Sequence, residues 1–226
     1  MNFPVQAELQ GASIVAIGRF NPAIFQPYWF SKHSLIREDQ AAKAQEAGPN
    51  FLIHKEATVF SLEWLGLQVT QERFSADTKD PAAHGLLRDL VVATFTILEH
   101  TPIEAFGLNR NLIFAMESKA DWHALGDYYA PKRSWEGILE DPGLALLTIT
   151  GRRKGLPARM QIRVSPTLAV ENGVQIDINQ HYDVSGEQLS STGAMTSALV
   201  REWDGFLGYT DRAAQHLLRE GLNHGE

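Results

Sequence analysis

The stretch VQIDINQHYDV, residues 174–184, alternates apolar and polar side chains with the two-residue period of a β-strand. Its apolar members would face a core. Its polar members, on the opposite face, are Asp177, Asn179, His181 and Asp183. Asn172-Gly173, directly before this stretch, is a dipeptide that strongly favours a tight β-hairpin. The stretch is therefore expected to be one strand of an antiparallel sheet.

Further strands and several helices are expected along the chain. Strand patterns occur at residues 13–20, 57–64, 67–74, 103–107, 144–150 and 159–165. Helical patterns occur at residues 24–36, 37–47, 81–100, 118–129 and 193–221. This order predicts an α+β fold, with an antiparallel sheet of roughly six to eight strands flanked by the helices near residues 81–100 and 193–221.

An internal echo suggests a duplication. IEAFG at residues 103–107 resembles IVAIG at residues 14–18, and each precedes a helix rich in aromatic residues. We expect one domain, residues 1–226, built from two pseudo-repeats of about residues 12–100 and 102–221. The arrangement would be a duplicated helix-grip or TBP-like one, and the alternative is a plain α+β antiparallel sheet.

Composition narrows the classes of function. The chain has 226 residues, a net charge of −7 and no cysteine, which excludes disulfides and thiolate metal ligands. Its longest basic run is Arg152-Arg153-Lys154, so no nucleic-acid partner is expected. No apolar run approaches the ~20 residues of a membrane helix, and the first residues lack a signal-peptide pattern. We expect a cytoplasmic protein that does not bind a membrane.

Three segments carry a resemblance to other proteins. HTPIEAFGLNRNLIF (100–114), DWHALGDYYAPKRSWEGIL (121–139) and GVQIDINQHYDV (173–184) resemble segments of uncharacterised bacterial proteins of similar length. The resemblance implies no activity, cofactor or catalytic residue for this chain.

The polar face of residues 174–184 is the first candidate site. Asp177 and His181 could form part of a metal or acid–base site, completed by His123 or Glu99. Neighbouring residues of one strand face lie ~6.6 Å apart, so a flat row supplies no metal site by itself, and no metal is expected. The alternative is a solvated sheet face. His123 also has Asp127 one helical turn later, either as an orienting carboxylate or as an ordinary surface pair.

Other groups could bind a ligand or a partner. Arg110, in GLNRN, and Arg19 could hold an anion together, or could each pair with a surface acid. Asn179 and His181 could also orient a ligand. The first-half aromatics are candidates for a protein interface or for the core, and they are Phe25, Tyr28, Trp29 and Phe30.

These observations lead to one functional prediction and two alternatives. No common catalytic signature occurs, and GRRKG at residues 151–155 lacks phosphate-loop spacing. We expect a non-enzymatic adaptor or accessory subunit that binds a protein partner or a second copy, without a cofactor. The first alternative is a small-molecule-binding helix-grip protein with an apolar pocket between the sheet and the C-terminal helix. The second is a hydrolase or lyase that uses His181, Asp177 and His123.

Overall fold

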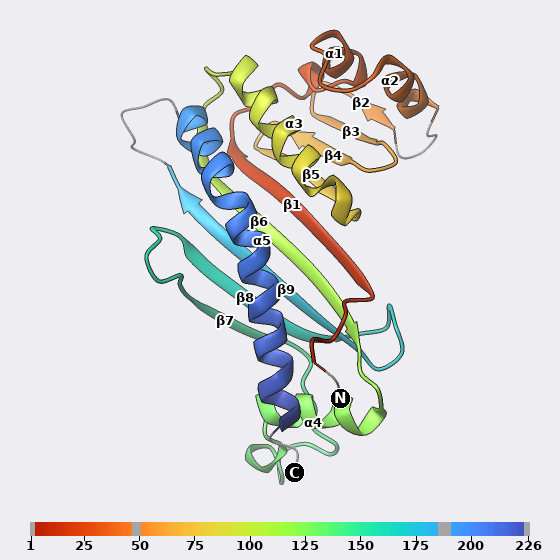
Figure 1. Cartoon of the computed structure of the whole chain (residues 1–226), viewed down its shortest axis with the longest axis vertical. Coiled ribbons are helices and arrows are strands. Elements are labelled where there is room, and N and C mark those ends of the chain that lie inside the picture. Colours follow the sequence, from red (N-terminus) through yellow and green to blue (C-terminus); the bar gives the residue numbers. More distant parts are fainter. Residues whose placement is uncertain (1–2, 47–50, 185–190, 224–226) are drawn as a thin grey trace. The chain divides into compact units, whose positions relative to one another are not determined.

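The computed structural model describes residues 3–46, 51–184 and 191–223, and it has an α+β fold (Figure 1). Within these residues nine strands form an antiparallel sheet in the order β2-β3-β4-β5-β1-β6-β9-β8-β7. The strands are β1 (Leu9–Gly18), β2 (Leu52–Ile53), β3 (Ala57–Ser61), β4 (Gly66–Thr70), β5 (Arg73–Thr78), β6 (Ile103–Ala115), β7 (Leu147–Arg152), β8 (Arg159–Thr167) and β9 (Gly173–Asp183). The predicted fold class is confirmed.

Five α-helices and three short 3₁₀ helices accompany these strands in the described ranges. The α-helices are α1 (Pro27–Lys32), α2 (Glu38–Gln45), α3 (His84–Ile97), α4 (Lys119–Tyr129) and α5 (Ser191–Asn223). The 3₁₀ helices are η1 (Pro22–Ile24), η3 (Pro81–Ala83) and η4 (Lys132–Ser134). None of these helices combines the length and the apolar character that a bilayer crossing requires.

The strand count exceeds the predicted six to eight because one predicted strand is two and because the short strand β2 matches no predicted segment. Residues 67–74 form the end of β4 and the start of β5, which reverse direction at Gln71-Glu72. The Thr70 hydroxyl accepts a hydrogen bond of 3.1 Å from the Arg73 amide across this turn. A threonine side chain thus supplies the turn that glycine or asparagine usually marks in a sequence.

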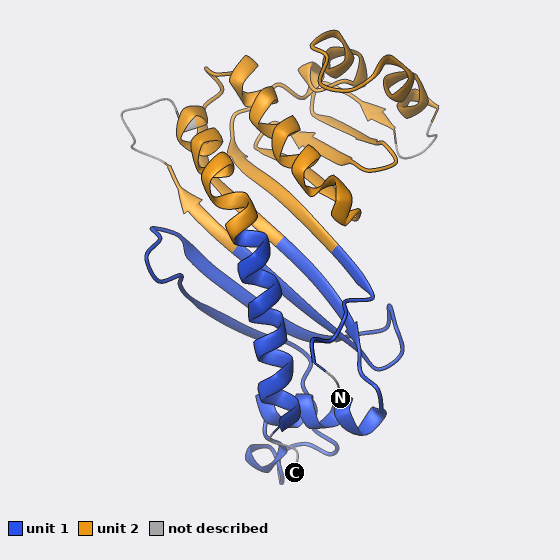
Figure 2. Ribbon diagram, in the orientation of Figure 1, with its two compact units in different colours: residues 1–10, 110–179, 206–226 blue, residues 11–109, 180–205 orange. Residues whose placement is uncertain are grey.

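The chain divides into two compact units, each assembled from separate segments (Figure 2). Unit 1 comprises residues 1–10, 110–179 and 206–226, and unit 2 comprises residues 11–109 and 180–205. Strands β1, β6 and β9 and helix α5 each contribute residues to both units. The predicted pseudo-repeats, residues 12–100 and 102–221, do not coincide with these units, and the duplication stays a prediction.

Unit 2 has an aromatic core. Phe74 lies 5.6 Å from Phe25 and 5.0 Å from Phe95, measured between ring centroids. Trp203 of α5 is fully buried, and its indole N–H donates a 3.0 Å hydrogen bond to the His84 carbonyl of α3. These rings remove a large apolar area from water, which is the main stabilising term of the unit.

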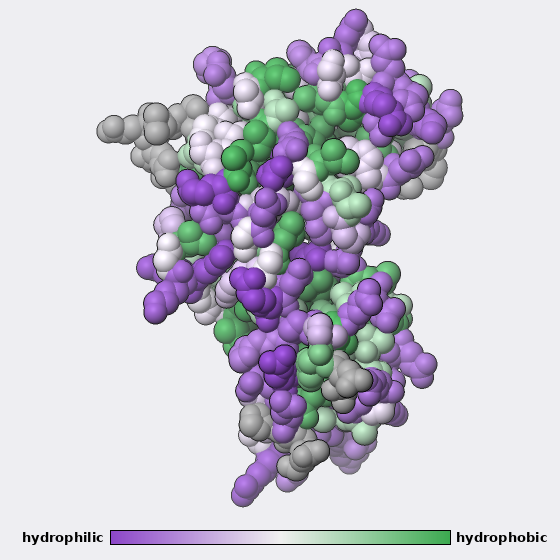
Figure 3. All heavy atoms as spheres, viewed as in Figure 1, coloured by the Kyte–Doolittle hydropathy of each residue, from purple (hydrophilic) through white to green (hydrophobic). Residues whose placement is uncertain are grey.

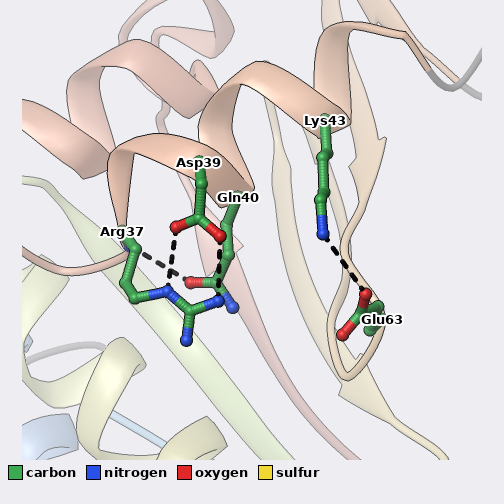
Figure 4. A network of polar contacts seen from close by, with 5 residues as sticks. All are labelled: Arg37, Asp39, Gln40, Lys43 and Glu63. Atoms are coloured by element: carbon green, nitrogen blue, oxygen red, sulfur yellow. Dashed lines mark hydrogen bonds and ion pairs between the residues drawn. The ribbon is translucent and has the colours of Figure 1, made fainter.

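Helix α2 of unit 2 begins with a polar network rather than a serine or threonine cap (Figure 4). The Gln40 side chain accepts a 3.1 Å hydrogen bond from the Arg37 amide. The Arg37 guanidinium also holds both carboxylate oxygens of Asp39, at 2.9 and 3.0 Å, and this lowers the pKa of Asp39. One turn later Lys43 lies 3.8 Å from Glu63. The helix predicted from residue 37 therefore begins at Glu38, with Arg37 as its N-cap.

Unit 1 is built on the alternation that residues 174–184 display in the sequence. Val174, Ile176 and Ile178 are almost fully buried, whereas the residues between them are half-buried. The buried residues of α5 in this unit include Ala214 and Leu218. The outward side of α5 is mainly hydrophilic (Figure 3), as expected for a helix with one apolar stripe.

Candidate functional site

A cavity of about 450 Å³ lies in unit 1, beside helix α4. One wall is the α4 helix, another is the end of strand β8 with the start of β9, and a third is the loop after η4. The apolar lining residues include Trp122, Leu125, Leu144, Val164 and Val174. The ionisable lining residues are His123, Asp127, Lys132, Glu136 and Asp141. Apolar walls with a few polar groups are typical of small-molecule sites.

Helix α4 is fixed at its first turn. The Ser118 hydroxyl accepts a 3.0 Å hydrogen bond from the Asp121 amide, as a serine N-cap does, and donates one of 2.7 Å to the Asp121 carboxylate. The Trp122 indole N–H then donates a 3.1 Å hydrogen bond to the Gly173 carbonyl at the start of β9. This bond joins the helical wall of the cavity to the strand wall.

The other end of α4 is fixed against α5. A Cβ atom at Gly221 of α5 would lie 3.0 Å from Leu125 Cγ, so the glycine permits a close approach of the two helices. The Tyr129 hydroxyl donates a 2.8 Å hydrogen bond to the Leu217 carbonyl. Burial raises the pKa of Tyr129 to about 12, with smaller contributions from Tyr128 and Glu220. The phenol therefore stays a hydrogen-bond donor at neutral pH.

The charges at the cavity are unequal in sign. Asp127 pairs with Lys132 at 3.1 Å, and their side chains are 42% and 40% exposed, respectively. Glu136 and Asp141 are exposed, and neither has an ion pair with a described residue. The three carboxylates of the lining thus outnumber its single lysine, so the ionised side chains of the lining carry a net negative charge.

The predicted pair of His123 and Asp127 is not formed as an orienting pair. Asp127 binds Lys132, while the His123 ring packs edge-on against Trp122, with centroids 5.0 Å apart. No hydrogen bond joins the two side chains in the described part of the chain. His123 nevertheless lines the cavity, where the sequence alone placed it only on a helix surface.

In unit 1, Asp177 of the polar row of β9 is bonded to neighbouring amide side chains. Both carboxylate oxygens of Asp177 accept amide hydrogen bonds, from Asn111 of β6 at 2.5 Å and from Gln175 at 2.9 Å. Asn179 is half-buried in the same unit, whereas His181 belongs to unit 2. Among the described residues, no group of three His, Cys, Asp or Glu side chains could hold a metal ion.

The two predicted anion-binding arginines have different environments. Arg110 is almost fully buried in unit 1, where its guanidinium bonds to the Gln10 side chain and, at 3.3 Å, to Asp211 of α5. Burial lowers the pKa of Arg110, and Asp211 opposes that shift. Arg19 is exposed in unit 2, and its amide donates a 2.9 Å hydrogen bond to the Pro102 carbonyl. In unit 1 the guanidinium of Arg110 thus serves the packing of sheet and helix.

The predicted aromatic interface is mostly core. Phe25 and Phe30 are 1% and 0% exposed and belong to the aromatic core of unit 2, so they offer no surface to a partner. Tyr28 is 61% exposed, and Trp29 is partly exposed. Phe30 of α1 packs against Phe60 of β3, with ring centroids 5.8 Å apart, and Phe25, which precedes α1, packs against Phe74 of β5. Sequence clustering alone does not reveal these contacts.

The cavity itself was not predicted. Its walls come from three segments far apart in the sequence, residues 122–127, 132–144 and 164–174. The one available signal was Gly126 in the middle of a helical pattern, which leaves space beside the helix. Neither a protein-family model nor a curated protein matches this chain.

Proposed function

We propose that the protein is a non-enzymatic binding protein that holds a small molecule in the cavity beside α4. The observation that carries the proposal is the cavity volume of about 450 Å³, because ligand pockets commonly measure ~300 to 1,000 Å³. The helical wall is held at both ends, by Trp122 and by Tyr129, so the cavity needs little reorganisation to accept a ligand. This location differs from the predicted pocket between the sheet and the C-terminal helix.

The lining supports a ligand with an apolar body and a basic group. Trp122, Leu125 and Val164 provide apolar contact, and a ring system would bury its faces against them. At the rim, Glu136 and Asp141 add negative charge beyond the Asp127 pair with Lys132. A cationic group would be attracted there, and an anionic group would be repelled.

Two probes with one ring system and opposite charges test this proposal. Calorimetric titration with 1-naphthylmethylammonium and with 1-naphthalenesulfonate compares the charges at similar apolar area. We expect the cation to bind up to about tenfold more tightly, since exposed charges contribute ~0.2 to 1 kcal/mol each. Equal binding of both probes, or tighter binding of the sulfonate, would overturn the assignment of ligand charge, and binding of neither would overturn the site.

Two variants test whether Glu136 and Asp141, the exposed carboxylates at the rim of the cavity, are responsible for the preference for the cation. The double variant Glu136→Gln with Asp141→Asn should remove most of the preference for the cation. Glu140→Gln is the matched control, because Glu140 is exposed in the same loop but does not line the cavity. A control variant that changed the preference as strongly would mean that the general negative charge of the surface, and not the rim, selects the cation.

A protein partner is the second candidate function, and exposed apolar side chains in unit 1 favour it. They lie in the segment of residues 128–149 and are Tyr128, Trp135, Ile138, Leu139, Leu146 and Ile149, each at least 37% exposed. Such a concentration is typical of interaction surfaces. We propose that an adaptor function, if the protein has one, uses this segment to contact a partner or a second copy.

A surface variant tests the second candidate. Chemical cross-linking in extracts of the native host should give a defined complex with the wild type, which Ile138→Ser with Leu139→Ser abolishes. Leu168→Ser is the control, because Leu168 is fully exposed in unit 1 but lies outside the segment. Loss of the complex with both variants would argue against this segment as the interface.

The hydrolase or lyase remains the weakest proposal. It requires His123 and Asp177 to act on one substrate with His181, and Asp177 already has both carboxylate oxygens bonded to amide groups. Hydrolysis of an ester or amide substrate that is lost in Asp177→Asn but kept in Gln175→Ala would support it.

A further inference from the structure

Strand β7 ends the sheet order and forms one of its edges. One long edge of β7 pairs antiparallel with β8, with Leu147 opposite Val164 and Arg152 opposite Arg159. All its residues except Leu147 are exposed. An edge strand presents backbone N–H and C=O groups to any extended segment that reaches it. Its sequence, LTITGR, contains no proline and is rich in β-branched residues, so it is suited to pair with another strand.

The β7–β8 hairpin is strongly basic in an acidic protein. Between Pro142 and Val170 the chain has no Asp or Glu, and its basic residues there are Arg152, Arg153, Lys154, Arg159 and Arg163. The net charge of the whole chain is −7. A local reversal of sign of this kind favours association with an anionic partner.

Three of these arginines share one face of the hairpin. Arg152 stands directly opposite Arg159, and Arg163 stands opposite Thr148, so the side chains of all three project from the same side. Like charges directly opposite each other on a sheet are destabilising. Among the described residues, no carboxylate lies within 4.0 Å of any of these three guanidinium groups. Other arginines of the chain do form ion pairs with carboxylates. Arg153 does not belong to this face, because its guanidinium stacks on the Tyr209 ring at 4.5 Å.

The opposite side of β7 is apolar. Leu147 and Ile149 alternate with Thr148 and Thr150 and so point away from the arginine face. Ile149 is 57% exposed, and its β8 partner, Ile162, is partly exposed. On one face, a segment added beside β7 would have Thr148, Thr150 and Arg152 as its neighbours, with Arg159 and Arg163 one strand further away on β8, ~4.8 Å beyond β7. On the other face its side chains would lie next to Ile149.

We propose that β7 binds an extended segment of a partner protein in which acidic residues alternate with apolar ones, added as a further strand of the sheet. The acidic side chains would pair with Arg152, Arg159 and Arg163, and the apolar ones would cover Ile149. The free strand edge together with the two-sided pattern favours a peptide over a nucleic acid, which would use the positive charge but neither the backbone edge nor the apolar side. This site is separate from the residues that line the α4 cavity, so it stands independently of the ligand proposed there.

Peptide binding measured by fluorescence anisotropy tests the chemistry of the partner. The probe is a fluorescein-labelled peptide of about eight residues in which glutamate alternates with valine, matched to the length of an ordinary strand. A second peptide carries glutamine in place of glutamate, and a third has the same composition as the first with the acidic residues in one block. We expect the alternating acidic peptide to bind about tenfold more tightly than either control, and less tightly as salt increases. Equal binding of the three peptides, or no binding of any, would overturn the proposal.

Charge variants locate the site. Arg159→Gln and Arg163→Gln should each weaken binding of the alternating acidic peptide roughly two- to fivefold. Arg133→Gln is the matched control, because Arg133 is an exposed arginine of unit 1 outside the hairpin, and it should leave binding unchanged. An equal loss of peptide affinity in Arg133→Gln would mean that binding depends on the general positive charge of the surface, and it would contradict the proposal. All three positions are exposed, so the variants should fold like the wild type.

Hydrogen exchange distinguishes strand addition from simple charge attraction. Amides of residues 147–152 should exchange more slowly when the peptide is bound, because backbone pairing protects them. Unchanged exchange with a bound peptide would contradict strand addition. Tighter binding of a double-stranded oligonucleotide than of the peptide, lost in Arg159→Gln, would assign the arginine face to nucleic acid instead.

Discussion

Replacing Tyr129 by phenylalanine removes a single hydroxyl from the contact between α4 and α5. The hydroxyl donates a 2.8 Å hydrogen bond to the Leu217 carbonyl. Because Leu217 lies inside helix α5, its carbonyl keeps its helical partner and is not left without a hydrogen bond. The expected cost at neutral pH is therefore the net value of one hydrogen bond, about 1 kcal/mol, rather than the larger penalty of a buried group without a partner.

The same substitution should change how stability depends on pH. The Tyr129 pKa is raised from 10.0 to about 12, chiefly by burial. The phenol of the unfolded chain therefore ionises first, so stability is fully present below pH 10 and is lost as the pH rises toward about 12. A shift of two units corresponds to at most ~2.7 kcal/mol, and solvent screening of this half-buried group reduces it to ~1 kcal/mol. The Tyr129→Phe variant has no phenol to ionise at this position, so it should not show this loss of stability at high pH.

The assay is urea denaturation, followed by tryptophan fluorescence, of the wild type and of Tyr129→Phe at pH 7 and near pH 12. The wild type should be more stable by about 1 kcal/mol at pH 7, and the two proteins should be nearly equal at the alkaline pH. Tyr28→Phe is the control, because Tyr28 is 61% exposed and lies in unit 2, and it should have little effect at either pH. A stability difference that stays the same at both pH values would refute the reasoning about Tyr129 burial.

Three further predictions concern unit 2 and use the same unfolding measurement. Gly18→Ala should destabilise the protein by about 2 to 4 kcal/mol, because the added Cβ would lie 2.1 Å from the Pro102 carbonyl oxygen. This oxygen also accepts a hydrogen bond from the Arg19 amide, which the clash would disturb. Gly205→Ala should stabilise by about 0.5 to 1 kcal/mol, since a Cβ in that helix meets nothing within 4 Å, and equal shifts in the two variants would contradict this reading. Burial raises the pKa of Asp77, so stability from Asp77 is present below its ordinary pKa of 3.8 and is lost as the pH rises through the folded value. Asp77→Asn should therefore stabilise the protein at pH 7, and this advantage should disappear near pH 3, whereas an advantage of equal size at both pH values would speak against the burial effect.

The elements that the sequence predicts well are those whose pattern is local. The alternation of residues 174–184 and the apolar stripe of the last helix are each complete within one segment, and both appear as β9 and α5 with small shifts of their ends. At the start of the helix predicted for residues 81–100, Asp80 caps the turn at Pro81 by accepting a 2.9 Å hydrogen bond from the Ala82 amide. Such signals are set by backbone chemistry within a few residues.

The elements predicted poorly depend on partners far away in the sequence. The strand expected at residues 103–107 continues to Ala115, because the polar residues that resemble a loop are accommodated by distant groups. Asn111 bonds to Asp177 and Arg110 to Asp211, and neither pairing is visible in the order of residues. Local polarity therefore ended the predicted strand too early.

The candidate site shows the same limit. The aromatic segment DWHALGDYY is prominent in the sequence, but apart from Gly126 its reading as helix and core gives no indication of unfilled space beside it. The cavity arises because the loop of residues 132–144 passes over α4 without filling the space between them. A volume left empty by packing is set by three-dimensional distances, and no spacing of residue types encodes it.

Filling the cavity tests the central claim most directly. Gly126 lines the cavity, and a Cβ there lies 3.9 Å from Leu144 in ordinary contact, so Gly126→Leu should place its side chain in the space without straining α4. Gly205→Leu makes the same change at an open helical position of α5. With 1-naphthylmethylammonium as the probe, calorimetry should show an affinity at least about tenfold lower for Gly126→Leu, and wild-type affinity for Gly205→Leu. Wild-type affinity in a folded Gly126→Leu variant would contradict the assignment of this cavity as the binding site.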